Sequence, residues 1–234
     1  MNKNKNKHNR TFNQIWLNGD YVRKLLLILL IVLIEITILF IPEKLAYTTK
    51  QYIYIDPGHG GFDGGAVVKD IVEKDLVLKV SYMLKDYFEC SGYNVLMTRY
   101  KDISLKNTKK EDIYKRVELI NKQNTLIFIS IHANTFPSSN VFGSQVFYKE
   151  NNKNKILAET IQEYLRLVDN NKRFAKSISD KYILDHINKT GCLVEIGFLS
   201  NEKDYNNLCN NIYLENLSKH IYLGVIDYLN KQGE

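Results

Sequence analysis

The chain has 234 residues, of which 44% are hydrophobic, so it is large enough for one ordinary domain with a buried core and a short extension. Its formal net charge of +6 would suit a nucleic-acid-binding protein. However, residues 1–24 contain six basic side chains and one acidic side chain, which leaves 26 basic and 25 acidic side chains for the other 210 residues. The positive charge therefore belongs to an N-terminal tail, and the composition argues against a nucleic-acid partner.

The three cysteines, Cys90, Cys192 and Cys209, include no pair with the C-x-x-C spacing. An odd number without that spacing argues against a disulfide framework and against a cysteine metal site. Cys192 lies in an apolar run, which is typical of a small core residue. A single bond between Cys192 and Cys209 stays open, because exported proteins form disulfides.

An apolar run of 17 residues, 25–41, follows the basic tail. Roughly 17–25 apolar residues span a bilayer as a helix, and a basic segment before such a helix stays in the cytoplasm. We therefore interpret 1–24 as a cytoplasmic tail, 25–41 as a signal anchor or transmembrane helix, 42–50 as a linker and 51–234 as an exported domain held at the membrane. A cleaved signal peptide is the main alternative, and a buried core helix is a weaker one.

From residue 51 onward, apolar strands alternate with helical patterns. Strands are expected at Tyr52–Ile55, Tyr93–Thr98, Leu126–Ile131, Gly143–Tyr148 and Leu193–Ile196. Helices are expected at 73–89, 111–123, 154–168 and 211–231. Asp70 is a candidate cap for the first of these helices. The alternation predicts a single α/β domain with a mostly parallel, twisted sheet flanked by helices.

A glycine-rich turn follows the first strand and contains a histidine. Five of the twelve glycines lie between Gly58 and Gly65, and His59 stands among them. The turn lacks the Lys-Ser or Lys-Thr of a phosphate loop and the G-x-G-x-x-G spacing of a dinucleotide site. Because open α/β sheets place their functional sites at the carboxyl ends of strands, His59 is a candidate functional residue. A histidine that only makes hydrogen bonds within the turn is the alternative.

A second histidine, His132, comes directly after the strand Leu126–Ile131 and should reach the same sheet edge. Two histidines at one edge suit zinc, which in catalytic sites usually takes three protein ligands and a water. Glu73, at the start of the first helix, is the best third candidate. Asp63 and Asp75 are weaker candidates, because Asp75 would point away on the helix and Asp63 is equally well placed to fix the turn. Singly, His132 could be a satisfied core histidine and Glu73 an ordinary helix-start acid.

Glu195 is embedded in the apolar segment Leu193–Phe198. Burying a carboxylate costs free energy unless the group has a partner or a task. Burial also raises the pKa of a carboxylate, which suits a general base acting on water. A buried ion pair with Arg99 or Arg116 is the alternative interpretation.

These motifs together resemble the type-3 family of zinc-dependent N-acetylmuramoyl-L-alanine amidases. The matching segments are Ile55–Gly61, Glu73–Leu76, Met97–Arg99, Arg116–Val117, Ser130–Asn134 and Val194–Asn201. The resemblance implies a single α/β catalytic domain over 51–234, Zn²⁺ held by His59, Glu73 and His132, and Glu195 as the catalytic carboxylate. It also implies hydrolysis of the amide that joins N-acetylmuramic acid to L-alanine in peptidoglycan.

Within this family, the chain is most similar to the germination-specific amidases of the spore cortex, which are short and have an export segment. That resemblance implies removal of stem peptides before muramic-δ-lactam forms, and an exported accessory protein as a possible partner. Alternatives are a general cell-wall amidase, an exported zinc peptidase that cuts within stem peptides, and a wall-binding protein without catalysis.

Overall fold

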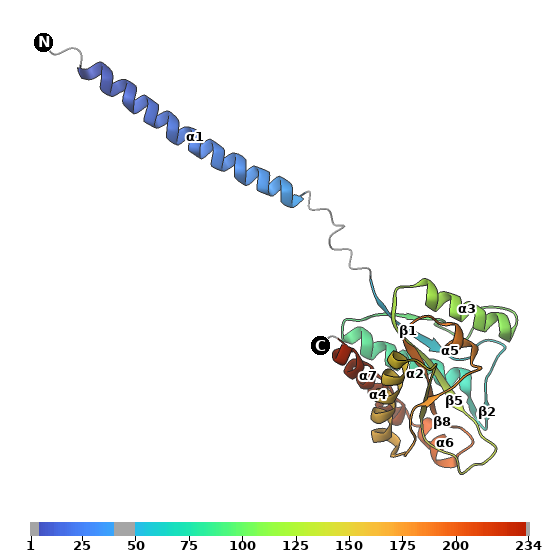
Figure 1. The fold of residues 1–234 in the computed structure, drawn as a ribbon. Coiled ribbons are helices and arrows are strands. Elements are labelled where there is room, and N and C mark those ends of the chain that lie inside the picture. Colours follow the sequence, from blue (N-terminus) through green and yellow to red (C-terminus); the bar gives the residue numbers. More distant parts are fainter. Residues whose placement is uncertain (1–4, 40–49, 233–234) are drawn as a thin grey trace. The chain divides into compact units, whose positions relative to one another are not determined.

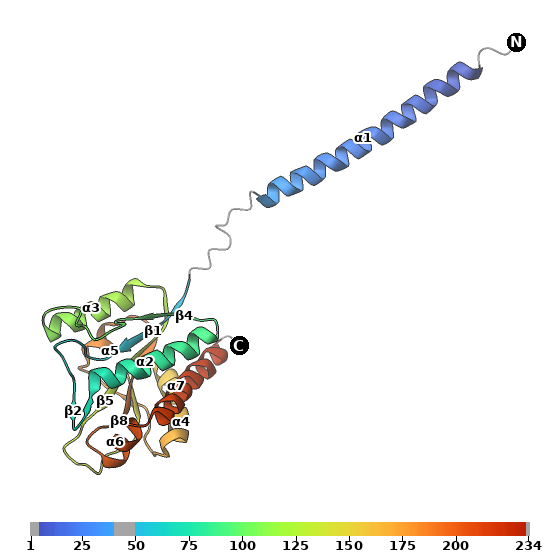
Figure 2. The same cartoon turned by 180° about the vertical axis from the view of Figure 1, so that it is seen from behind.

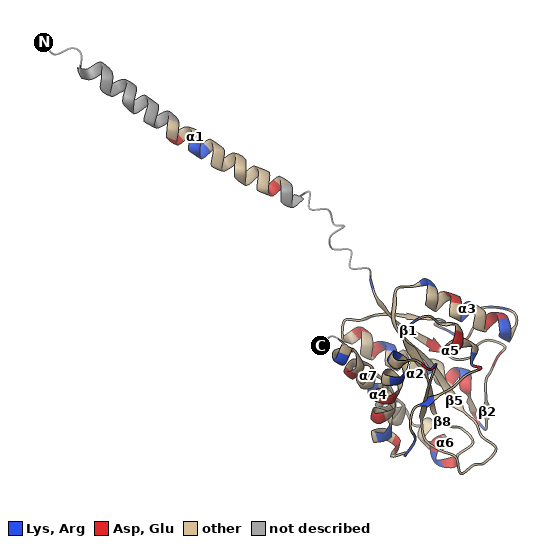
Figure 3. Cartoon of the chain, in the orientation of Figure 1, with Lys and Arg blue, Asp and Glu red and all other residues tan. Residues whose placement is uncertain are grey.

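The computed structural model describes residues 5–39 and 50–232, which fall into two units, 1–49 and 50–234. In the first unit, the described element is α1 (Lys5–Leu39). In Figure 3, a stretch of this helix without charged residues, drawn tan, lies between a blue basic segment and a red acidic one and corresponds to residues 25–34. Among the described residues, no helix combines the length and apolarity that crossing a membrane requires. The expected anchor is therefore not shown, and its residues 40–41, like 42–49 of the expected linker, lie outside the described part of the chain.

The second unit contains a six-stranded sheet in the order β4-β1-β5-β8-β6-β7. Neighbouring strands are parallel except β6 and β8, so the prediction of a mostly parallel sheet is confirmed. The strands are β1 (Tyr52–Pro57), β4 (Asn94–Met97), β5 (Thr125–Asn134), β6 (Gln145–Tyr148), β7 (Lys176–Ser177) and β8 (Gly191–Phe198). A separate antiparallel hairpin joins β2 (Val67–Val68) to β3 (Ile71–Val72).

Helices cover both faces of this sheet (Figures 1 and 2). On one face, the larger core cluster packs α2 (Glu73–Cys90), α4 (Asn152–Asp169) and α7 (Asn211–Gln232) against side chains such as Ile129 and Val194. On the other face, α3 (Lys109–Lys122) and α5 (Tyr182–His186) pack against a smaller cluster that includes Phe128 and Leu193. A short helix, α6 (Glu202–Leu208), follows β8. Alternate residues of the central strands face the two clusters, as the period of two requires.

Several element ends differ from the expected ones for local reasons. The Asp70 cap is wrong, because the chain enters α2 directly from β3 and Val72 is the N-cap, without a side-chain hydrogen bond. Gly143 lies outside β6 because it has a φ of 88°, a conformation that interrupts a strand. The strand β5 continues to Asn134, so His132 lies within it rather than after it. The three cysteines are free, with Cys192 buried and the other two exposed.

Candidate metal centre

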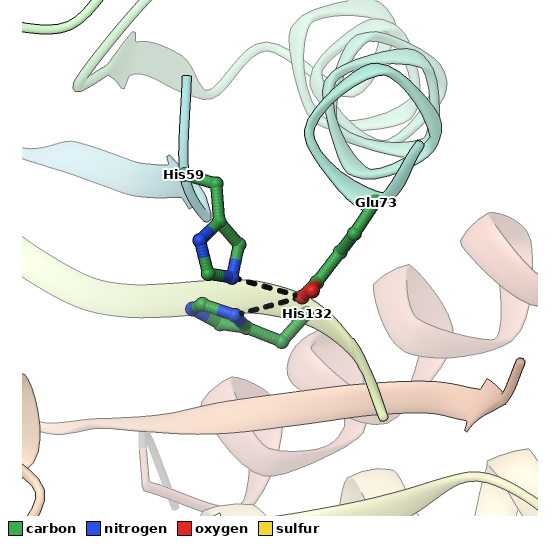
Figure 4. A group of neighbouring side chains, drawn as sticks. All are labelled: His59, Glu73 and His132. Atoms are coloured by element: carbon green, nitrogen blue, oxygen red, sulfur yellow. Dashed lines mark hydrogen bonds and ion pairs between the residues drawn. The ribbon is translucent and has the colours of Figure 1, made fainter. Parts of the chain in front are cut away.

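Three side chains from different elements converge at the carboxyl edge of the sheet (Figure 4). His59 follows β1, Glu73 is the first residue of α2, and His132 lies in β5. Oε1 of Glu73 lies 3.2 Å from Nε2 of His59 and 3.1 Å from Nδ1 of His132. Zinc bonds to nitrogen and oxygen are about 2.0–2.1 Å long, so two ligands of a tetrahedral ion lie about 3.3 Å apart. The spacing of the three side chains therefore fits a zinc ion.

Two glycines allow this close approach. A Cβ at Gly58 would lie 2.4 Å from Cε1 of His132. A Cβ at Gly65 would lie 2.5 Å from Oε2 of Glu73 and 2.7 Å from Cδ2 of His59, and Gly65 also has a φ of 67°. Any other residue at these positions would displace the converging side chains. The glycine-rich turn thus brings backbone against side chains of the site, as its composition indicates.

Asp63 orients His59 from within the same turn. Oδ2 of Asp63 lies 2.8 Å from Nδ1 of His59, and Oδ1 lies 2.7 Å from Nζ of Lys109. The contact at Nδ1 leaves Nε2 of His59 directed at Glu73, which is the usual arrangement behind a metal-binding imidazole. Asp63 therefore holds a ligand candidate instead of being one. Asp75, the other weak candidate, is exposed and is not part of the cluster.

Glu73 is buried and keeps both carboxylate oxygens occupied. Oε1 accepts a hydrogen bond from the backbone N–H of Ala133 at 3.0 Å, and Oε2 accepts one from Ala66 at 2.8 Å. Burial works to raise the pKa of Glu73, but hydrogen bonds and charge from His132 and His59 outweigh it, and the pKa is lowered. Burial likewise works to lower the pKa of His59, which Glu73 and Asp63 nevertheless raise. The site therefore holds Glu73 as an anion.

Glu195 stands beside these residues in a different environment. It pairs in register with His132 across β5 and β8, so the two side chains point to the same face of the sheet. The residue is partly exposed as a whole, but its Oε2 is buried and has no hydrogen-bond partner among the described residues. Burial raises its pKa above the ordinary range. An enclosed carboxylate oxygen without a partner is available to take a proton from a molecule bound at the site.

The alternative ion pair between Glu195 and an arginine is wrong. Arg116 pairs with Asp56 and Asp112, with contacts of 2.8 and 2.6 Å. Arg99 donates instead to backbone carbonyl oxygens, including those of Pro57 at 3.1 Å and Gly58 at 2.8 Å. Both arginines therefore fasten the turn after β1.

A buried network below the turn fixes its position. Asp56, at 1% exposure, accepts hydrogen bonds from Oγ1 of Thr98 at 2.6 Å, Oγ of Ser130 at 2.7 Å and Nη1 of Arg116 at 2.8 Å. Arg116 also donates to the carbonyl oxygen of His59. The network joins β1, the residue directly after β4, β5 and α3. Above it lies a pocket of about 160 Å³ whose lining includes both histidines of the site.

The geometry thus places three candidate metal ligands beside a buried carboxylate, an arrangement compatible with a metal-dependent hydrolase. Comparison with known proteins makes this specific. The sequence profile described as N-acetylmuramoyl-L-alanine amidase (Amidase_3) matches residues 53–227. The chain belongs to this family, and its activity is that of an N-acetylmuramoyl-L-alanine amidase.

Individual relatives support the assignment. The chain is 38% identical to the germination-specific N-acetylmuramoyl-L-alanine amidase of Bacillus subtilis, over 79% of this chain and 82% of that protein. It is 28% identical to the amidase LytC of the same organism, over 76% of this chain but only 35% of LytC. The structure of the CwlD amidase from Clostridioides difficile, in complex with the GerS lipoprotein, has a TM-score of 0.74 at 36% identity and covers 78% of this chain and 100% of that chain.

Proposed function

We propose that this amidase is zinc-dependent and that His59, Glu73 and His132 hold the ion. The observation that carries the proposal is the meeting of these three side chains, whose candidate ligand atoms all lie within 4.8 Å of one another. When bound, zinc would supply a Lewis acid and would lower the pKa of water to about 7. Two imidazoles and one carboxylate form a donor set that zinc prefers.

We further propose that Glu195 is the general base and then the general acid. Its enclosed Oε2 would take the proton of the attacking water and deliver it to the amide nitrogen as the bond breaks. The products are then a free lactyl carboxylate on the muramic acid and a free amine on L-alanine. Asp63 keeps His59 oriented through its contact with Nδ1, and Glu73 is held as an anion, as a metal ligand requires.

The experiment is mass spectrometry of purified peptidoglycan after incubation with the zinc-loaded protein. Peptides that begin with a free L-alanine amine, together with glycan that has lost its peptides, are the expected products. New ends within the stem peptide would instead indicate an exported zinc peptidase. Full activity after chelation would contradict the zinc requirement.

For the cellular role, we propose cortex maturation in spores, in which peptide removal precedes formation of muramic-δ-lactam. The similarity to the germination-specific relative supports this role. Deleting the gene should leave spores whose cortex lacks the lactam and which germinate poorly. Normal lactam content would point to a general cell-wall amidase.

For location, we propose that 51–234 is an exported catalytic domain, that 25–41 acts as its signal anchor, with 42–50 as linker, and that 1–24 stays in the cytoplasm. The basic tail and the apolar run support this proposal, and that run continues past Leu39, where the described part of α1 ends. We also propose an exported accessory protein as partner, because the structure of the similar CwlD amidase is of a complex with the GerS lipoprotein. Recovery of one exported protein with the tagged full chain from sporulating cells would support it.

A further inference from the structure

Arg173 lies on the β6 side of Glu195, linked to it through Gln145, and takes no part in the chemistry described above. Gln145 pairs in register with Glu195 across β6 and β8, so their side chains share one face of the sheet. Nη1 of Arg173 donates to Oε1 of Gln145 at 2.7 Å. Nε2 of Gln145 donates in turn to the carbonyl oxygen of Phe174 at 3.1 Å, which fixes the amide so that its oxygen faces Arg173. One residue therefore separates the guanidinium from the proposed base.

The guanidinium is held rigidly but keeps free donors. Nε of Arg173 donates to the carbonyl oxygen of Phe142 at 2.7 Å, and the guanidinium carbon lies 4.7 Å from the centre of the Phe198 ring. An arginine has five N–H donors, and only two of them have acceptors among the described residues. No ion pair of the described residues includes Arg173. The carboxylates of Asp169 and Asp204 accept hydrogen bonds from backbone N–H groups and act on Arg173 only through their charge. A guanidinium that is held in one orientation and has free N–H donors suits a bidentate contact with a carboxylate.

The surrounding segment adds positive charge. Residues 170–181, between α4 and α5, contain four basic side chains and one acidic side chain. Lys176 pairs in register with Phe147 of β6 and is exposed. Lys181 is exposed as well and lies near enough to Glu195 for its charge to act on that carboxylate. An anionic group that approaches this side of the site meets a favourable potential.

The order of the strands gives the direction in which the substrate extends. Across the sheet, the order is His59 just beyond β1, then His132 in β5, Glu195 in β8 and Gln145 in β6. If Glu195 protonates the leaving nitrogen, as the proposed function states, the released peptide lies on the side of β6. Strands lie about 4.8 Å apart, so β5 and β6 are separated by about 10 Å, which an extended peptide covers in about three residues.

We propose that Arg173 is a specificity-determining residue that binds a carboxylate of the stem peptide, at the second or third residue beyond the cleaved amide, and that Gln145 positions it. The inference rests on the proposed function, since the substrate is the peptide-bearing glycan. Stem peptides carry carboxylates beyond their first alanine, and a bidentate contact with arginine would distinguish a free carboxylate from its amide.

The test compares three substrates: muropeptides with free carboxylates, with the second residue amidated, and with the third residue amidated. The full chain is assayed as wild type, Arg173→Gln, Arg173→Lys and Lys172→Gln. Lys172 is the matched control, because it is adjacent and exposed and its replacement removes the same charge. The wild type should show a KM about 10- to 100-fold higher for one of the amidated substrates, which identifies the carboxylate that is bound.

Arg173→Gln should raise the KM for the free-carboxylate substrate by about the same factor, leave kcat nearly unchanged and abolish the discrimination. Arg173→Lys should retain part of the discrimination, and Lys172→Gln should behave as the wild type does. A wild type that cleaves all three substrates equally, or an Arg173→Gln variant that loses kcat equally on all of them, would overturn the inference. A wild type inactive on every substrate would overturn the proposed function itself, and this inference with it.

Discussion

Glu73 and Glu195 are two glutamates of one site whose surroundings move their pKa values in opposite directions. For Glu73, the hydrogen bonds and charge of two histidines outweigh burial, and the pKa is lowered. For Glu195, burial dominates and the pKa is raised. Environments that separate two carboxylates in this way commonly separate their tasks. An anion suits a metal ligand, and a carboxylate whose pKa is raised by burial suits a base.

Exchanging each glutamate for glutamine should reveal this division. Glu195→Gln should fold and retain zinc, but its turnover should fall roughly 10²–10⁴-fold, the usual effect of losing a general acid–base group. Glu73→Gln should lose zinc affinity first and regain part of its activity with excess metal. The measurements are zinc stoichiometry and the release of peptides that begin with L-alanine. Loss of zinc from Glu195→Gln, together with full zinc content in Glu73→Gln, would reverse the two assignments.

The role of Gly65 is equally specific. Gly65→Ala would place a Cβ against Glu73 and His59 at a φ of 67°, so we expect weaker zinc binding together with about 1–3 kcal/mol of destabilisation. Gly92→Ala is the matched control, because Gly92 also has a positive φ, 84°, but its Cβ would meet nothing within 4 Å. Zinc titration and urea unfolding of both variants separate the two effects. Equal zinc affinity in both variants would contradict the close-approach role of Gly65.

At the scale of elements, hydrophobic periodicity predicts the five longer strands and four long helices, because each buries one face or both. The strands β2, β3 and β7 escape prediction because two residues cannot show an alternation, and the helices α5 and α6 escape it because five and seven residues are too few to show a helical period. The site follows partly from the same logic: His59 and His132 can be placed from strand ends alone. Gln145 and Arg173 cannot, because the antiparallel register of β6 against β8 depends on packing that the sequence does not display.

The buried network at Asp56 connects these elements, and its loss should weaken the whole domain. Asp56→Asn removes one of the two carboxylates that pair with Arg116 and weakens the hydrogen bonds to that charged group, so we expect a destabilisation of about 1.5–3 kcal/mol near neutral pH. Asp227→Asn is the surface control; it removes an exposed pair with Lys231 and should cost less than about 1 kcal/mol. Urea unfolding provides the measurement. Similar losses in the two variants would contradict the structural importance of the network.

The same network predicts a pH dependence with a definite sign. Burial works to raise the pKa of Asp56, but Arg116 and the hydroxyl groups of Thr98 and Ser130 outweigh it, and the folded-state pKa is lowered. A lowered folded-state pKa stabilises the protein fully above the unfolded value of about 3.9 and loses that contribution as the pH falls through the folded-state value. The difference in unfolding free energy between wild type and Asp56→Asn should therefore be largest near neutral pH and shrink in acid.

For the whole molecule, the charge distribution and the division into two units lead to a topological prediction. The basic tail and apolar run precede a domain that has its own core and a nearly balanced charge. If 25–41 acts as an anchor, protease added outside intact protoplasts should digest the domain from residue 51 onward, while an epitope placed within 1–24 stays protected. Detergent should remove that protection, which serves as the control for epitope integrity.

The apolar run should also determine retention at the membrane. Replacing two leucines within 25–34 by lysine adds charges that the hydrocarbon core accepts poorly, at about 2.5–3.5 kcal/mol each on insertion scales. We expect the altered chain to remain in the cytoplasm, where external protease does not reach its domain. The purified domain should still hydrolyse isolated peptidoglycan, because its core and site lie within 50–234. Release of a shortened wild-type chain into the medium would instead identify the run as a cleaved signal peptide. A wild-type domain found in the cytoplasm would contradict export altogether.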